Sequence, residues 1–274
     1  MTAVTTARAA LGRLRTIALA TALECTTGVA HAGFASVVID GFVISATGAP
    51  GSFVFAPTDT MSQAWDLQVL SGGATLDQNA NVLPNWDPAN ATAQAPHTNA
   101  TVSSFQFTDP LTQLLSPGFV LSATADLFAD GVLRTALGNM FSSGSFCFWD
   151  SAAPGDFDGT SASCSGSGSL TFTLFYDLIV SDEDSAYAEL NVVGTGVPGG
   201  LFFDFASNTL GVGSKEDQFF TWSADLTAGN AASFSLAGTV VAAAVPEPGI
   251  LGLVSLGLIG LCLTRRRSGT RAAA

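Results

Sequence analysis

Alternation of apolar and polar side chains is the feature that most limits how this chain can fold. From Leu170 to Val180, one face of an extended strand would carry Leu, Phe, Leu, Tyr, Leu and Val, whereas the other face is largely polar. Successive side chains point to opposite faces of a strand, so this pattern predicts a strand with one buried face. Further strands are predicted at 37–45, 65–70, 119–127, 186–193 and 233–242.

The segments between these strands predict the fold class. Clusters of Gly, Ser, Asn and Asp interrupt the strands at short intervals, and no amphipathic helix pattern occurs between residues 33 and 244. We therefore expect an all-β domain, an antiparallel β-sandwich or jelly roll. The acidic turn at 181–184 predicts a hairpin between 170–180 and 186–193. Residues 71–100 lack the alternation, and a long surface loop or a loosely ordered insertion is expected there.

The N-terminal residues have the layout of an export signal. The positive end is formed by Arg8, Arg13 and Arg15. An apolar segment begins at 17–23, and Ala30 and Ala32 flank His31 in a small-x-small cleavage site. Residues 1–32 are therefore predicted to be a signal peptide, and the mature chain should begin near Gly33.

The C-terminal residues combine a proline-flanked motif, an apolar segment and a basic cluster. The motif consists of Val245, Pro246, Glu247 and Pro248, and the cluster of Arg265, Arg266 and Arg267. Residues 249–264 contain no charge and would rise roughly 24 Å as a helix. The hydrocarbon core of a bilayer is ~30 Å thick, and the helix can span it if the arginine stems extend to the headgroups and the bilayer thins locally. We predict a transmembrane helix at 249–264, with residues 268–274 as a cytoplasmic tail.

This order of motif, helix and arginines resembles the PEP-CTERM sorting signal of Gram-negative bacteria. The resemblance covers about residues 245–267, where the three parts occur in order and without gaps. It implies recognition by the membrane protease exosortase, export, removal of the tail, and association with exopolysaccharide or biofilm matrix. The rest of such proteins varies widely, so the resemblance implies no catalytic residue.

Charge separates the exported region from the segments at its ends. Between residues 33 and 244 there are 20 acidic residues and two basic ones, Arg134 and Lys215, a formal charge of −18. Such a surface repels nucleic acid and anionic lipid, so neither is an expected partner of this region. The acidity either keeps the domain soluble or attracts divalent cations.

Two cysteines remain in the exported region. Cys147 and Cys164 are 17 positions apart, whereas Cys25 and Cys262 lie in the predicted signals. An even pair in an oxidising compartment predicts a disulfide. A metal site at these cysteines is not expected, because the region has one histidine, His97, and no Cys-x-x-Cys motif.

Few residues suggest chemistry. His97 lies in a polar segment with no nucleophile motif beside it, which favours an exposed loop histidine over a catalytic base. Asp156 and Asp158, which lie next to a turn glycine, form a candidate calcium site, although the pattern lacks the other ligands of an EF-hand loop. The acidic residues at 182–184 are a second, weaker candidate.

Three functions are compatible with these features. The leading hypothesis is a non-enzymatic envelope or matrix protein, sorted and processed by an exosortase-type system in the inner membrane. The second is a carbohydrate-binding module, with or without calcium, which presents Trp86, Trp149 or Trp222 to extracellular polysaccharide. Most tryptophans in a sandwich are core residues, however. The third is a secreted hydrolase, which would need two carboxylates at the right separation.

Overall fold

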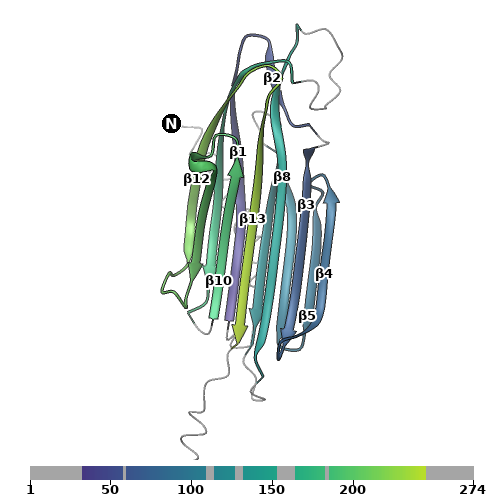
Figure 1. The fold of residues 1–274 in the computed structure, drawn as a ribbon, viewed down its shortest axis with the longest axis vertical. Coiled ribbons are helices and arrows are strands. Elements are labelled where there is room, and N and C mark those ends of the chain that lie inside the picture. Colours follow the sequence, from purple (N-terminus) through teal and green to yellow (C-terminus); the bar gives the residue numbers. More distant parts are fainter. Residues whose placement is uncertain are drawn as a thin grey trace, which may run out of the picture.

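The computed structural model describes residues 33–57, 60–108, 114–126, 132–152, 164–182 and 185–244. These residues form two antiparallel sheets whose strands run along the long axis of the molecule (Figure 1). The all-β sandwich expected from the alternating pattern is therefore confirmed. Five of the six predicted strands lie within longer strands, and the sixth, predicted at 119–127, overlaps a strand that ends at Ala125.

Sheet A has six strands. Their order is β12 (Lys215–Leu226), β9 (Gly168–Val180), β1 (Gly33–Gly48), β7 (Leu115–Ala125), β6 (Thr98–Thr108) and β5 (Ala89–Ala95). The register of β1 on β9 shifts between Ile39 and Gly41. Because of this bulge, the buried side chains of β1 change from odd positions, such as Val37 and Ile39, to even ones, such as Phe42 and Ile44.

Sheet B lies against sheet A. Its order is β11 (Leu201–Ser207), β10 (Ser185–Gly194), β13 (Ala231–Ala244), β8 (Arg134–Asp150), β3 (Ser62–Ser71) and β4 (Ala74–Pro84), and β2 (Ser52–Phe55) pairs with β8. A short 3-10 turn, η3 (Pro198–Gly200), precedes β11. The long strands β8 and β13 pair in register from Arg134 opposite Ala244 to Cys147 opposite Ala231.

Aromatic side chains from both sheets meet in the core. Phe42 and Phe172 of sheet A lie 6.0 Å apart between ring centroids, and Phe42 lies 5.2 Å from Phe234 of sheet B. Phe234 in turn stacks on Phe146 at 5.8 Å. All four rings are at most 3% exposed, so burial of large apolar area holds the two sheets face to face.

The predicted hairpin between 170–180 and 186–193 is wrong. After Asp182 the chain passes to the other sheet, so that β9 pairs with β1 and β12, and β10 pairs with β11 and β13. Alternation specifies which face of a strand is buried but not which strand it pairs with. A short acidic turn therefore suits a crossing between sheets as well as it suits a hairpin.

The predicted loop at 71–100 is also wrong, because β4, β5 and the start of β6 occupy it. The apolar positions of β5 are alanines: Ala91 and Ala93 are buried, while Asn90, Thr92 and Gln94 point outward. Alanine contrasts weakly with Thr and Asn in hydrophobicity, so the alternation was not evident. Nearly every residue of β4 is exposed, as suits an edge strand.

Side chains of β4 cover the open edge of β5. Asp77 accepts a hydrogen bond from the backbone N–H of Gln94 at 2.9 Å, and Asn79 donates to the backbone carbonyl of Thr92 at 3.2 Å. Trp65 holds Asn79 in place by donating its indole N–H at 3.2 Å. These bonds satisfy backbone groups that would otherwise be free to pair with another chain.

Candidate functional site

The predicted targeting residues lie outside the described part of the chain. This applies to the processing motif, the basic cluster and the signal-peptide cleavage site: Val245, Pro246, Glu247, Pro248, Arg265, Arg266, Arg267, Ala30 and Ala32. The described part of the fold extends to the residue directly before the motif, however. The last residue of β13, Ala244, is 0% exposed, and Gly33 packs close to the backbone of Ala243 at the same end of the sandwich.

The candidate calcium residues Asp156 and Asp158 also lie outside the described residues. Of the second acidic cluster, Asp182 is described and lies exposed after β9. Within the described ranges, no group of three or more His, Cys, Asp and Glu side chains is placed to hold a metal ion. His97 is exposed in the turn between β5 and β6.

The predicted disulfide between Cys147 and Cys164 is confirmed. Cys147 belongs to β8 of sheet B, and Cys164 precedes β9 of sheet A, so the bond links one sheet to the segment that enters the other. Both cysteines are at most 3% exposed and form a small apolar cluster with Phe55. Trp149 and Ala231 pack on this cluster and complete its cover.

The three tryptophans considered as ligand-binding residues are not an exposed aromatic surface. Trp86 is 0% exposed and Trp222 is 3% exposed, and both belong to the main core. Trp149 is half-buried against the disulfide, with its ring centroid 6.3 Å from that of Phe53. The structure places the accessible aromatic rings elsewhere.

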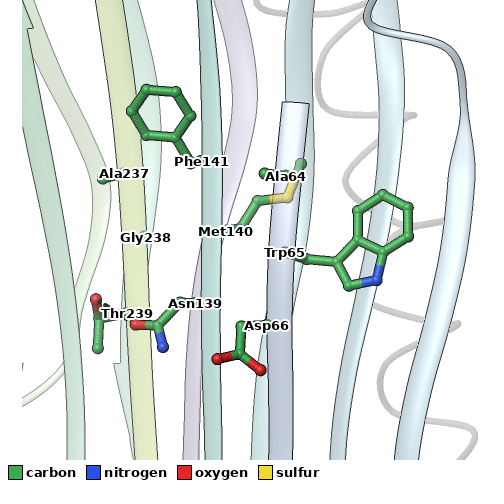
Figure 2. Close-up of a pocket in the computed structure, with 9 residues that line it drawn as sticks. All are labelled: Ala64, Trp65, Asp66, Asn139, Met140, Phe141, Ala237, Gly238 and Thr239. Carbon is green, nitrogen blue, oxygen red and sulfur yellow. Dashed lines mark hydrogen bonds between the residues drawn. The ribbon is translucent and has the colours of Figure 1, made fainter. Parts of the chain in front are cut away.

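The outer face of sheet B carries a shallow groove of about 250 Å³. Figure 2 shows its residues on the adjacent strands β3, β8 and β13. They are Ala64, Trp65, Asp66, Asn139, Met140, Phe141, Ala237, Gly238 and Thr239. The ring of Phe141 is 41% exposed, because its direct neighbours across the sheet are the small residues Ala64 and Ala237.

Strand pairing continues this groove into two parallel rows across the sheet. The apolar row consists of Phe203, Asn191, Ala237, Phe141, Ala64 and Val82, in the order of the strands from β11 to β4. The polar row consists of Phe205, Glu189, Thr239, Asn139, Asp66 and Ala80. Five inter-strand steps make each row roughly 24 Å long. Apart from Asn191 in the apolar row, and Phe205 and Ala80 at the ends of the polar row, the face is a long, open strip with one apolar side and one polar side.

Hydrogen bonds hold the polar row in place. Thr239 donates to the amide oxygen of Asn139 at 3.1 Å, and because Asn139 is exposed, its amide nitrogen can donate to a ligand. Asp66 accepts side-chain N–H groups from Gln68 at 3.0 Å and Gln78 at 2.9 Å. The groove thus offers an amide donor and a carboxylate acceptor beside an aromatic ring, and these groups are fixed before any ligand arrives.

Glu189 at the other end of the polar row is part of a second network. Its carboxylate accepts hydrogen bonds from the hydroxyl of Tyr187 and the side-chain amide of Asn191. Burial, the hydrogen bond to Glu189 and its negative charge raise the pKa of Tyr187 from 10.0 to about 12. Tyr176 donates to Asp204 at 2.6 Å, and burial followed by this carboxylate raises its pKa as well.

Tyrosine ionisation gives a direct test of these contacts, because the chain has only two tyrosines. At pH about 10.5, where free tyrosine is mostly ionised, we expect almost no tyrosinate absorbance from the folded protein. A raised pKa favours the protonated form in the folded state. The contribution of protonated Tyr187 to the stability of the folded state is therefore complete below pH about 10 and is lost as pH rises toward 12. In denaturant at the same pH, both residues should ionise. Titration of Tyr187 near pH 10 in the folded protein would contradict the described contacts.

Sequence reasoning missed the groove residues because β8 was not predicted as a strand. Its outward positions include Thr135, Asn139 and Ser143, and its inward ones include Gly138 and Gly144, so apolar contrast is low. The one local signal was Phe141, an aromatic at an outward position between polar ones. Its neighbours come from β3 and β13, about 75 and 100 residues away along the chain, and only the register brings them together.

Comparison with known proteins matches only the tail. The sequence model of the PEP-CTERM protein-sorting motif matches residues 244–267, which include the Val245–Pro248 motif, the apolar segment and the three arginines. No curated protein and no solved structure matches the chain. Among the described residues, no helix is long and apolar enough to cross a membrane, and the predicted helix at 249–264 lies outside them. The chain carries, at its C-terminus, the PEP-CTERM protein-sorting motif, which implies exosortase-dependent sorting of an envelope or extracellular protein.

Proposed function

We propose that the protein is a non-enzymatic component of the cell envelope or extracellular matrix, released from a membrane-anchored precursor by removal of its tail. The observation that carries the proposal is the boundary between fold and motif. The match begins at residue 244, and β13 ends at the same residue. Both sheets of the sandwich are thus formed by residues that precede the motif, which suits a cleavable signal.

Geometry at the groove supports a non-enzymatic role. Of the residues that line it, Asp66 is the only carboxylate. The nearest carboxylate in the same row is Glu189, three inter-strand steps away, which is roughly 14 Å. Glycosidases place their two carboxyl groups about 5–9.5 Å apart, so these two residues do not suit that chemistry. A secreted hydrolase is for this reason the weaker hypothesis.

Removing the tail tests the sorting part of the proposal. A variant lacking residues 245–274 should lose its normal distribution among inner membrane, outer envelope and medium, because the exosortase would have no motif to recognise. Cell fractionation with immunoblotting measures this distribution. The matched control lacks only residues 268–274, beyond the motif match, and should be sorted normally. If the longer deletion partitioned like the intact protein, the proposal would fail.

A further inference from the structure

The two rows on the outer face of sheet B describe the ligand that would fit there. The apolar row offers a ring surface at Phe141, 41% exposed, and a second at Phe203, 48% exposed. Immediately beside it, the polar row offers the amide nitrogen of Asn139 and the carboxylate of Asp66. A complementary ligand must have an apolar face and, along its edge, groups that both donate and accept hydrogen bonds. A hexose ring combines these properties, since its C–H groups gather on one face and its hydroxyls around the rim.

The shape of the surface indicates an extended ligand. The groove at Phe141 is open and holds about 250 Å³, below the ~300–1,000 Å³ of pockets that enclose small molecules. The rows continue on both sides of it, from β11 to β4. A chain of linked rings lying across the strands would therefore meet an apolar and a polar row over β13, β8 and β3, and two polar residues, Asn191 and Glu189, at β10.

We propose that this face binds a segment of a neutral polysaccharide, with one sugar ring stacked on Phe141 and its hydroxyls bonded to Asn139 and Asp66. This inference rests on the proposed function, which places the protein in the envelope or matrix, where it would meet the polymer. It adds the class of partner and the surface that binds it.

Charge disfavours anionic ligands and self-association at this face. The domain carries a formal charge of −18, and the polar row itself contains Asp66 and Glu189, so anionic polymers and nucleic acid are repelled. A second copy of the chain would face the same row with its own two carboxylates, because a two-fold interface uses the same surface twice. Charge favours one competitor, a basic peptide, so binding of polylysine in place of every neutral polymer would overturn the proposal.

Affinity electrophoresis or microcalorimetry on the full-length protein in detergent tests the proposal, with dextran, laminarin, mannan and amylose as neutral probes and alginate as the anionic one. Binding to at least one neutral polymer and none to alginate is expected. Phe141→Ala should weaken that binding about tenfold or more, and Asn139→Ala by less. The matched control is Phe219→Ala, which removes a 65% exposed ring from sheet A and should leave affinity unchanged. Thermal unfolding checks that each variant is folded.

Several results would contradict binding of a neutral polysaccharide at this face. The proposal would be overturned by the absence of binding to any neutral probe, by equal losses of affinity in Phe141→Ala and Phe219→Ala, or by binding dominated by alginate. A concentration-dependent dimer in sedimentation that Phe141→Ala abolishes, while sugar binding is absent, would also overturn it. Fractionation of the tail deletion is independent of these measurements. Normal sorting without polysaccharide binding would contradict this inference and leave the proposed function intact. Polysaccharide binding without tail-dependent sorting would contradict only the proposed sorting by the tail.

Discussion

Replacing Trp86 with alanine is expected to destabilise the folded protein by about 3–5 kcal/mol, the cost of deleting a large buried side chain. Trp86 lies between β4 and β5, where the chain passes from sheet B to sheet A, and it is 0% exposed. Its ring centroid lies 6.3 Å from that of Phe146 and 5.7 Å from that of Phe234, and its indole N–H donates to the carbonyl of Ser143 at 2.9 Å. Denaturant unfolding followed by circular dichroism measures the loss.

The contact between Trp86 and Gly144 of β8 gives the control. A Cβ at position 144 would lie inside contact distance of the indole ring, so Gly144→Ala should cost roughly 1–3 kcal/mol through overpacking. In the Trp86→Ala background, the same methyl group enters empty space and should cost little. Gly213→Ala, which meets nothing within 4 Å, is the neutral reference. Additive effects of the Trp86 and Gly144 changes would show that the two residues do not touch.

Loss of the disulfide between Cys147 and Cys164 is the second large effect. In the chain-entropy account, a bond that closes a loop of 17 residues stabilises the fold by roughly 3 kcal/mol, because it restricts the unfolded chain. Cys147→Ser also places a hydroxyl in a site that is 0% exposed, which adds a desolvation cost. Chemical unfolding of the wild type with and without reductant gives the loop contribution alone.

Cysteine 262 provides the matched control for the disulfide experiment. It lies in the predicted membrane segment, outside the described residues, so Cys262→Ser should leave the unfolding curve of the sandwich unchanged. An unfolding midpoint that did not respond to reductant would contradict a stabilising bond. The compartment provides a further check, because the bond should form in exported protein and remain open in protein retained in the cytoplasm.

Strands with strong apolar contrast were predictable, and the reason is local. Leu170–Val180 alternates large apolar with polar residues, so its buried face follows from the pattern alone. The β5 strand follows the same rule with Ala91 and Ala93, but alanine is too small to distinguish its buried face. Trp86 is buried but lies in the connection between β4 and β5, so it belongs to no strand whose alternation could indicate its burial.

Pairing between strands could not be predicted, and the candidate site depends on pairing. Phe141, Asp66 and Thr239 come from three strands that are distant in sequence. Each is unremarkable beside its own neighbours, and only the register of β3 and β13 on β8 aligns them in rows. The disulfide was predictable because elimination left two cysteines. The sorting motif was predictable because its parts are contiguous.

The central claim is that the sandwich is delivered by its tail and then separated from it. Intact-mass spectrometry of the protein recovered from the envelope or medium tests this most directly. We expect a chain that begins near Gly33 and ends close to the Val245–Pro248 motif, without Arg265–Arg267. Recovery of an exported protein that still carries the three arginines would contradict it.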